Sequence, residues 1–393
     1  MLVCLAAASC SGRQQGPLDQ RLTEALEARL RQYDVRGASA AVILPDRSIH
    51  RIVAGISHES VRIRPEMLFA IGSITKNYVA TLVLRLAEEG ALSLDDSLSR
   101  WLPAYPRVNG GVTIRQALSH RSGIAMFWEN QRLWDDLKAH RDSVFTPEVV
   151  LSYVGEPDFT PDSGFRYSNT NYLLLAMIAT RATRSTLSAQ LRERFWRPLG
   201  LASTYLSMED SIPRERLAHV WGDNFDGDGS DRDVTFLPRA SHESITYGSA
   251  GVFTTAEELA LWSHALFHGE LISQASLERM TAFRPAARGL RGSYGLGLQL
   301  FTPRLTAGVR AYGHGGGNIG TSAYVAYLPD FDVSIALMIN RMHGRCPDAM
   351  LRDVIRIVSR HLSESSRVSS TRGRSSPRRP REPGGRSGSW SSA

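Results

Sequence analysis

The chain has 393 residues, of which 42% are hydrophobic and 22% charged, and this composition excludes a disordered or fibrous protein. Only three cysteines are present, two of them within the first ten residues, which excludes a disulfide framework or a cysteine-rich metal scaffold. The formal net charge is +7, but seven arginines against two glutamates place +5 of it in segment 363–393. This Ser/Arg/Pro-rich tail is predicted to be disordered, and no specific nucleic-acid partner is expected for the folded part.

Residues 1–15 are predicted to be a signal or lipoprotein leader. The first ten residues form an apolar run that is too short for a bilayer-spanning helix, which needs about 20 residues. The small residues Ala7, Ala8 and Ser9 directly precede Cys10, as in a bacterial lipoprotein cleavage site, although no basic residue precedes the apolar run. We therefore expect an exported protein, either periplasmic or anchored to the membrane through a lipidated Cys10.

Strand patterns occur near both ends of the chain, and helical patterns occupy most of the middle. An amphipathic helix is predicted over 17–34, because leucines recur there at helical spacing. Between 73 and 267 the pattern is mostly helical and rich in loops. The predicted strands form a hairpin at 40–44 and 48–55 and a second group at 308–312, 321–327 and 333–340, which a final helix at 348–362 follows.

The distribution of these elements predicts an α/β (α+β) fold in one domain over residues 16–362. Strands from the two ends of the chain have to pair in one antiparallel sheet that helices flank. A mostly helical lobe, about 85–245, is then inserted between the strands of the two ends. The acidic loop 223–233 lacks the closing glutamate of a calcium loop, so we expect no metal there.

The segment with the clearest chemical pattern begins at Ser73 and continues to Lys76. Apolar residues after Lys76 recur at helical spacing, so Ser73 is predicted to open a buried helix. A separation of three residues places the lysine one turn away on the same face, within reach of the serine hydroxyl. A serine is a weak nucleophile until a neighbouring base takes its proton, and a desolvated lysine can be such a base. Taken alone, the pair also fits a helix-capping serine beside a surface lysine.

Two further motifs follow the Ser73 segment. Tyr167-Ser-Asn169 lies roughly ninety residues later, and His314-Gly-Gly316, followed by Gly317, lies near the far end. In this order and at these distances, the three motifs resemble the serine β-lactamase and penicillin-binding protein superfamily. The subgroup of class C β-lactamases, D-alanyl-D-alanine carboxypeptidases and related esterases is the most similar. The resemblance covers residues 18–362, includes the segments 113–124, 247–260 and 294–297, and implies a β-lactamase/transpeptidase-like fold.

The resemblance implies a role for each motif residue. Ser73 matches the acylated nucleophile, and Lys76 matches its partner in proton transfer. Tyr167 matches the residue proposed as general base in this subgroup. Asn169 matches the amide that holds both the substrate and the lysine. The chain is therefore expected to hydrolyse an amide or ester, such as a β-lactam, a D-Ala peptide or a carboxylic ester, through an acyl-Ser73 intermediate.

The glycine-rich motif departs from the pattern of many members. His314-Gly315-Gly316 stands where many β-lactamases have Lys-Thr-Gly, whose lysine meets a substrate carboxylate. The charge of a histidine near neutral pH depends on its surroundings, so the motif leaves β-lactam hydrolysis open and is compatible with peptidase and esterase chemistry. The sequence does not choose among β-lactamase, D-Ala carboxypeptidase or D-aminopeptidase, and carboxylesterase. The resemblance also implies an oxyanion hole made of the backbone N–H groups of Ser73 and Gly317.

Specificity is expected to come from the loops 125–140 and 219–242. Their aromatic residues form either an apolar wall of the cleft or ordinary packing within the lobe. These residues are Phe127, Trp128, Trp134, Trp221 and Phe225.

Other functional classes compete with this hypothesis. A conventional α/β-hydrolase is disfavoured, because no Gly-x-Ser-x-Gly motif is present. His264 and His268 have the spacing of a zinc-protease pair, but Ala265 occupies the position of its glutamate, and we interpret them as two histidines on a helix face. A penicillin- or peptidoglycan-recognising sensor with little turnover is the alternative. We expect a monomer with a small-molecule or peptide substrate, peptidoglycan being one candidate, and with no cofactor or metal.

Overall fold

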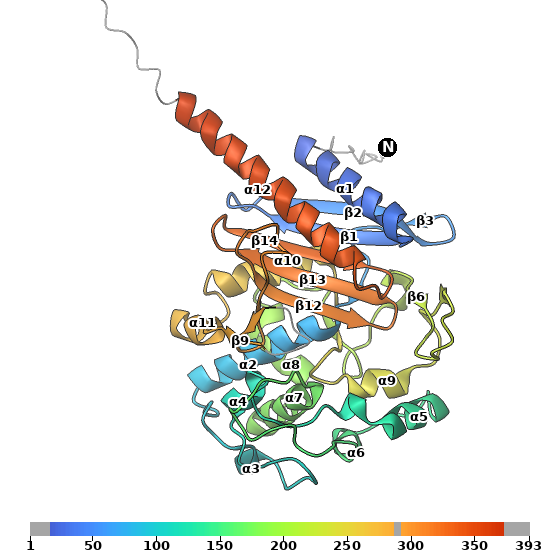
Figure 1. The fold of residues 1–393 in the computed structure, drawn as a ribbon, viewed down its shortest axis with the longest axis vertical. Coiled ribbons are helices and arrows are strands. Elements are labelled where there is room, and N and C mark those ends of the chain that lie inside the picture. Colours follow the sequence, from blue (N-terminus) through green and yellow to red (C-terminus); the bar gives the residue numbers. More distant parts are fainter. Residues whose placement is uncertain (1–15, 287–291, 373–393) are drawn as a thin grey trace, which may run out of the picture.

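The computed structural model describes residues 16–286 and 292–372, and its largest sheet has nine antiparallel strands (Figure 1). The order across this sheet is β3 (Val61–Arg62), β2 (Ile49–His58), β1 (Gly37–Ile43), β14 (Val333–Ile339), β13 (Thr321–Leu328), β12 (Tyr312–Asn318), β11 (Gln299–Leu300), β10 (Ser293–Tyr294) and β9 (Arg284–Pro285). Strands from the two ends of the chain meet at β1 and β14, where Ala38 lies opposite Ile339 and Ile43 opposite Ser334.

Helices cover both faces of this sheet, so its central strands are buried on two sides. Every residue of β1 and β14 is buried, and both strands are apolar or small-residue runs without polar alternation. α1 (Pro17–Tyr33) and α12 (Cys346–Arg372) lie together on the upper face in Figure 1, and α10 (Ala256–Phe267) packs on the other face. The buried stripe of α1 consists of leucines four residues apart: Leu18, Leu22, Leu26 and Leu30.

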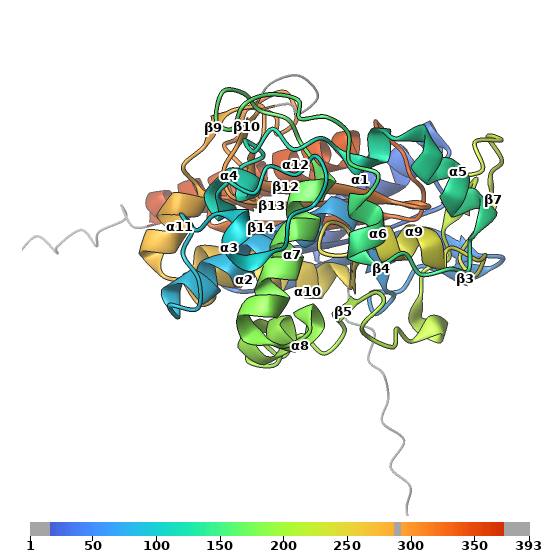
Figure 2. The same ribbon diagram turned by 90° about the horizontal axis from the view of Figure 1, so that it is seen from below.

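A mostly helical lobe lies below the sheet, and Figure 2 shows α7 (Asn169–Thr183) running across α2 (Thr75–Glu88) at its centre. Most residues of both helices are buried. Tyr78 of α2 stacks on Trp262 of α10 with ring centroids 3.9 Å apart, which joins the lobe to the sheet. The other helices of the lobe are α3 (Leu98–Trp101), α4 (Ile114–Leu118), α5 (Gln131–Ala139), α6 (Pro147–Leu151), α8 (Leu187–Leu191) and α9 (Ala240–Ile245).

Short elements connect these parts. β4 (Phe69–Ala70), β8 (Val252–Thr254) and β5 (Tyr205–Leu206) form a small sheet from which the chain enters α2. β6 (Trp221–Gly222) pairs with β7 (Arg232–Asp233) at one side of the molecule. The remaining helices are short: η1 (Gly72–Ile74), η2 (Phe127–Glu129), the π-helical η3 (Arg192–Trp196), η4 (Arg214–Arg216) and α11 (Gln274–Met280).

The predicted fold class is confirmed, but two predicted boundaries are wrong. The strand expected at 308–312 begins only at Tyr312 and continues through the glycine-rich motif, because β11 and β13 pair with it on both sides. The last helix continues to Arg372, since no glycine or proline interrupts it before Gly373. The predicted disorder is therefore wrong for 363–372. The remainder of the predicted tail, and the leader with Cys10, lie outside the described residues.

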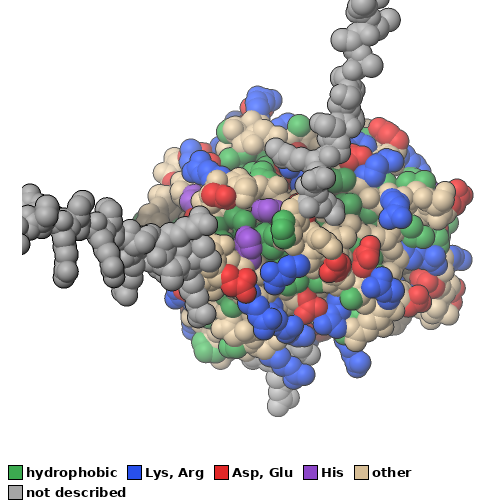
Figure 3. All heavy atoms as spheres, turned by 90° about the horizontal axis from the view of Figure 1, so that it is seen from above, with side chains coloured by type: hydrophobic (Ala, Val, Ile, Leu, Met, Phe, Trp, Pro, Cys, Tyr) green, Lys and Arg blue, Asp and Glu red, His purple; other side chains and the backbone are tan. Residues whose placement is uncertain are grey.

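Charged side chains of both signs are interspersed on the face shown in Figure 3. The structure also has surface ion pairs, such as Arg194 with Glu89 at 2.8 Å and Arg107 with Glu156 at 2.8 Å. Each exposed pair of this kind contributes only about 0–1 kcal/mol to stability. Within 16–286 and 292–372, no helix combines the length and apolar character that crossing a bilayer requires.

Candidate active site

Ser73 lies in the turn between β4 and α2, directly against β12. Gly72 in this turn adopts φ +52°, a left-handed conformation that favours glycine. A β-carbon at Gly72 would lie 2.3 Å from the Gly317 carbonyl oxygen, and one at Gly316 would lie 1.9 Å from the Ile71 carbonyl oxygen. Only glycine at these positions allows the two backbones to approach so closely. The first and third sequence motifs therefore meet in space.

Lys76 lies on the first turn of α2 and is completely buried. Its Nζ is 3.0 Å from Ser73 Oγ and 2.8 Å from the carbonyl oxygen of Ser249. Burial alone lowers the pKa of Lys76 well below 10.5, because no opposite charge compensates for the loss of solvent. A lysine in this environment becomes neutral at a lower pH than an exposed one, and a neutral amine can accept the Ser73 proton.

Tyr167, on the loop before α7, faces the same pair. Lys76 Nζ lies 4.9 Å from the centre of the Tyr167 ring. The phenol oxygen is buried without a hydrogen-bond partner, and burial raises its pKa, although the nearby Ser73 hydroxyl offsets part of the rise. Because burial lowers the pKa of Lys76 and raises that of Tyr167, the neutral pair is favoured. In the neutral pair the amine can accept a proton and the phenol can donate one.

His120 holds the loop that carries Tyr167. Its Nδ1 accepts a hydrogen bond from the Ser168 N–H at 3.1 Å, and its carbonyl oxygen accepts one from the Arg166 N–H at 3.0 Å. The rings of His120 and Tyr167 pack with centroids 4.4 Å apart. Burial lowers the pKa of His120, so the ring is neutral and carries its proton on Nε2. His120 is therefore a positioning residue for Tyr167.

Asn169 opens α7 beside the site but does not hold Lys76. Its backbone N–H donates to Met126 Sδ at 3.0 Å, and its Oδ1 is buried without a hydrogen-bond partner. The expected Asn169–Lys76 hydrogen bond is wrong for this structure, where Lys76 Nζ bonds instead to Ser73 Oγ and to the Ser249 carbonyl oxygen. The expected contact of Asn169 with a substrate stays a prediction.

His314 lies on β12 and is neutral at pH 7. Its Nδ1 is 2.6 Å from the Gly315 carbonyl oxygen, so Nδ1 carries the proton, and Nε2 accepts from the Tyr294 hydroxyl at 3.0 Å. Burial, with a smaller effect of Lys76, lowers the pKa of His314 to about 3. This histidine therefore cannot offer a substrate carboxylate the positive charge that a lysine would provide at the same position.

The expected oxyanion donors, the backbone N–H groups of Ser73 and Gly317, belong to the two segments that touch. A β-carbon at Gly72, the residue before Ser73, would lie 2.6 Å from the Gly317 nitrogen. The turn and the strand are thus adjacent where an oxyanion would need two donors. The role of these two groups stays a prediction.

Two adjoining cavities open at the site. One of about 320 Å³ is lined by Ser73, Tyr167 and His314 among other residues. The second, of about 380 Å³, shares Gly317 and Met342 with the first. Phe127, one of the five aromatic residues singled out in the sequence, belongs to the buried core. The other four line this second cavity: Trp128, Trp134, Trp221 and Phe225. We call this second space the aromatic cavity.

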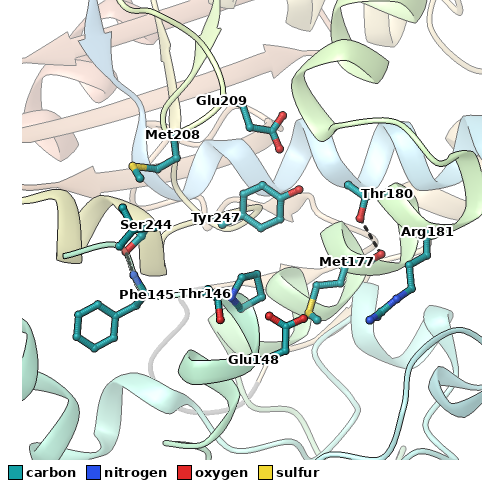
Figure 4. A pocket seen from close by; sticks show the side chains of 12 residues that line it. Phe145, Thr146, Glu148, Met177, Thr180, Arg181, Met208, Glu209, Ser244 and Tyr247 are labelled. Atoms are coloured by element: carbon teal, nitrogen blue, oxygen red, sulfur yellow. Dashed lines mark hydrogen bonds between the residues drawn. The ribbon is translucent and has the colours of Figure 1, made fainter.

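A further cavity of about 380 Å³ lies elsewhere in the helical lobe (Figure 4). Met177 and Tyr247 contribute to its wall, and no lining residue is shared with the two cavities at Ser73. Glu209 at its edge accepts hydrogen bonds from the Ser188 and Leu187 N–H groups. Because no motif residue lines this cavity, it is separate from the candidate active site.

Three residues that complete the site were not singled out from the sequence: Ser249, His120 and Tyr294. They hold Lys76, the Tyr167 loop and His314 respectively. All three lie in the segments 113–124, 247–260 and 294–297, which already resembled the superfamily. That resemblance was the signal that could have identified them.

Comparisons with known proteins agree with this arrangement. The chain is 28% identical over 295 residues to penicillin-binding protein 4* of Bacillus subtilis (strain 168), which covers 71% of this chain but only 62% of the relative. It is 29% identical over 338 residues to penicillin-binding protein 4 of Amycolatopsis lactamdurans, which covers 81% and 84%. A solved D-stereospecific amidohydrolase from Streptomyces sp. superposes with a TM-score of 0.72 at 28% identity and covers 82% of this chain and 94% of that one. The Beta-lactamase family model matches residues 20–359, and the chain therefore belongs to the Beta-lactamase family.

Proposed function

We propose that the chain is a serine hydrolase that cleaves an amide or ester through an acyl-enzyme on Ser73. The position of Lys76 carries this proposal, because its Nζ is fully buried and lies 3.0 Å from Ser73 Oγ. A surface lysine beside a helix-capping serine, the alternative origin of such a pair, would be exposed. Burying an amine without a counter-ion costs several kcal/mol, which a purely structural position would avoid.

In the acylation step, neutral Lys76 accepts the proton of Ser73 as Oγ attacks the carbonyl carbon. The N–H groups of Ser73 and Gly317 stabilise the oxyanion, and losing one such donor typically costs about 10²–10³ in rate. Tyr167 donates its proton to the leaving amine or alkoxide and regains one from Lys76. Water then attacks the acyl carbon, which releases the acid and restores the serine hydroxyl.

We infer that the favoured substrates are amides or esters of D-configured residues that need no carboxylate contact on β12. The neutral state of His314 supports this inference, since it leaves that strand position without a positive charge. The similarity to a D-stereospecific amidohydrolase also supports it. β-Lactams and D-Ala peptides, which carry a carboxylate, are the alternatives within the same chemistry.

The presence of the aromatic cavity favours substrates that carry a bulky apolar group. It adjoins the catalytic cleft at Gly317 and has the size of a small-ligand pocket. Four buried polar atoms on its lining residues have no hydrogen-bond partner: Trp128 Nε1, Asn224 Oδ1, Ser230 Oγ and His242 Nδ1. Such atoms favour a group that is apolar along its length and carries a donor or acceptor at its end.

The test is a substrate panel with the full-length chain. D- and L-alanine amide, D- and L-phenylalanine amide, a p-nitrophenyl ester and penicillin are compared by turnover and by intact mass. We expect turnover of the D-amides and a transient acyl adduct. A lasting penicillin adduct without turnover of any substrate would instead favour a penicillin-recognising sensor, and rapid loss of penicillin would favour a β-lactamase.

Phe225→Ala tests the role of the aromatic cavity. We expect kcat/KM for D-phenylalanine amide to fall about tenfold or more, whereas that for D-alanine amide changes by less than about threefold, because only the larger side chain reaches the cavity wall. Phe236→Ala is the matched control, since Phe236 is 46% exposed and lines neither cavity. An equal loss for both amides would contradict a specificity role and indicate a structural one.

We also propose that the protein is exported and anchored as a lipoprotein through Cys10, where a monomer would reach cell-wall peptides. The basis is the small-residue pattern before Cys10 in the sequence. The measurement is the mass of the N-terminal peptide from a bacterial host, in wild type and Cys10→Ser. An N-terminus that keeps residues 1–9 in the wild type would contradict the proposal.

A further inference from the structure

Two histidines and an aspartate from distant parts of the chain meet at the edge of the large sheet. His264 lies on the last turn of α10, and His268 directly follows that helix. Asp332 lies in the turn between β13 and β14, next to the end of α10. One potential ligand atom from each of the three residues lies within 4.8 Å of the other two. None of the three lines the cavities at Ser73.

The ring of His268 turns one nitrogen toward a backbone carbonyl and the other toward Asp332. Its Nδ1 is 2.7 Å from the carbonyl oxygen of His264, and a carbonyl only accepts, so Nδ1 carries a proton. Its Nε2 faces Asp332, 3.1 Å from Oδ1. Nε2 and this carboxylate oxygen are therefore close enough to bind one metal ion together. A histidine that donates one ring N–H to a backbone carbonyl and turns the other nitrogen outward has the arrangement of a metal ligand.

His264 supplies an independent observation that points to a ligand. The side chain is 8% exposed, and neither ring nitrogen has a hydrogen-bond partner. Its ring lies 3.8 Å from that of His268, centroid to centroid. An ion pair between His268 and Asp332 would leave both nitrogens of His264 without a partner. Buried ring nitrogens normally have a partner, and a metal ion would supply one to the nitrogen that coordinates it.

The surroundings of Asp332 also fit a metal site. The Tyr327 hydroxyl donates to Asp332 Oδ1 at 3.0 Å, which orients the carboxylate as outer contacts do around bound metals. Asp332 and His268 are partly exposed, so an ion and a water molecule can reach them. Glu270 adds negative charge near His264, while Arg47 adds positive charge there.

We propose that His264, His268 and Asp332 bind a divalent zinc-type cation, with water as the fourth ligand, and that this ion joins the end of α10 to the β13–β14 turn. Two imidazoles and one carboxylate form a donor set that Zn²⁺ accepts. Ligand atoms about 2.1 Å from a tetrahedral zinc lie about 3.4 Å from one another. The three atoms are at most 4.8 Å apart, so a small rotation of the side chains brings them into this geometry.

This site differs from the zinc-protease pattern that the sequence excludes. The helix has no glutamate beside the two histidines, and the third ligand comes from a turn more than sixty residues later. The three proposed ligands lie outside the linings of both cavities at Ser73. The ion would therefore stabilise the fold rather than take part in the reaction at Ser73.

Zinc binding to the untagged full-length chain tests the proposal. After removal of metals with a chelator and dialysis, calorimetric titration with ZnCl₂ is expected to show one site per chain in addition to any sites elsewhere. His264→Gln and Asp332→Asn are each expected to weaken this site at least about tenfold, because each removes one of three protein ligands. His140→Gln is the matched control, since His140 is an exposed histidine at another helix end.

Thermal unfolding gives a second readout. At a Zn²⁺ concentration about 100-fold above Kd, the melting temperature of the wild type is expected to rise by about 3–4 °C, and neither variant is expected to show this rise. Asp332→Asn keeps a side chain that tolerates the positive φ of 51° at this position, so the fold of that variant is retained. The proposal would be overturned if the wild type and both variants had the same zinc affinity and the same shift in melting temperature. It would also be overturned if the wild type showed no zinc site.

Discussion

Replacement of Ser73 by alanine is expected to lower kcat/KM by at least about 10⁴-fold on every substrate that the wild type turns over. The variant has no oxygen to form the acyl-enzyme, so only substrate binding and the oxyanion donors remain. Its stability is expected to stay near that of the wild type, because Ser73 is partly exposed and Lys76 keeps its hydrogen bond to the Ser249 carbonyl oxygen. Progress curves and intact mass after reaction with penicillin or an ester measure the effect.

Ser119→Ala provides the matched control. Ser119 has intermediate exposure like Ser73, but its hydroxyl bonds only to carbonyl oxygens within its own helix end. This variant is expected to keep full activity and the wild-type adduct. Acylation of the Ser73→Ala variant on any other residue, or turnover within tenfold of the wild type, would show that Ser73 is not the nucleophile.

The local part of this site was predictable from the sequence, because it depends on helical geometry alone. Ser73 and Lys76 are three residues apart at the start of a helix, and their atoms lie 3.0 Å apart in the structure. The contact that fixes the base is not local. Ser249 reaches Lys76 across 173 residues, and no periodicity in the sequence encodes such a contact. The expected partner, Asn169, was assigned by resemblance and is replaced in that role by a backbone oxygen.

The fold was predictable in class but not at its glycine-rich strand. The apolar runs of β1 and β14 indicate a buried sheet, because strands covered on both faces lose their polar alternation. β12 has no such run, since its central residues are glycine. Its strand conformation comes from pairing with β11 and β13 and from the close approach of the turn at Gly72, both of which depend on distant segments.

The protonation states were the part that only packing could decide. A histidine in place of the strand lysine leaves the charge at that position open, and burial against Tyr294 makes it neutral. The same holds for the choice between Lys76 and Tyr167 as the base. Desolvation acts on both groups but in opposite directions, because one is charged when protonated and the other when deprotonated.

Lys76→Met is expected to lower the acylation rate by about 10²–10⁴-fold, the usual contribution of a positioned general base. Methionine fills a similar volume without an amine, so the main structural change is the loss of the bond to the Ser249 carbonyl oxygen. Lys76→Arg is the second variant, since a guanidinium stays charged at all accessible pH values and cannot accept the serine proton. Turnover of either variant at the wild-type rate would contradict the role of Lys76 as the base.

The pH dependence of kcat/KM distinguishes Lys76 from Tyr167 as that base. Only the neutral amine accepts a proton, so wild-type activity is expected to be lost as the pH falls through the lowered pKa of Lys76 and to be retained above it. The raised pKa of Tyr167 keeps the phenol protonated over the same range. Tyr167→Phe is therefore expected to lower the rate without shifting the pH at which activity is lost. The measurement is kcat/KM for an amide without a titrating group between pH 5 and about 10. If the acidic fall in kcat/KM shifts in Tyr167→Phe but persists in Lys76→Met, the group that titrates there is the tyrosine and not the lysine.

The lowered pKa of Lys76 can also be tested through the stability of the protein, without measuring turnover. Between the lowered pKa of folded Lys76 and its unfolded value of 10.5, the unfolded chain binds a proton that the folded chain does not. The free energy of unfolding of the wild type is therefore expected to rise relative to that of Lys76→Met as the pH increases through this window. The difference between the two denaturant midpoints, measured at several pH values, isolates this contribution, because all other titrating groups are common to both proteins. A difference that does not change with pH would mean that Lys76 keeps its ordinary pKa and is charged beside Ser73, which the proposed base catalysis does not allow.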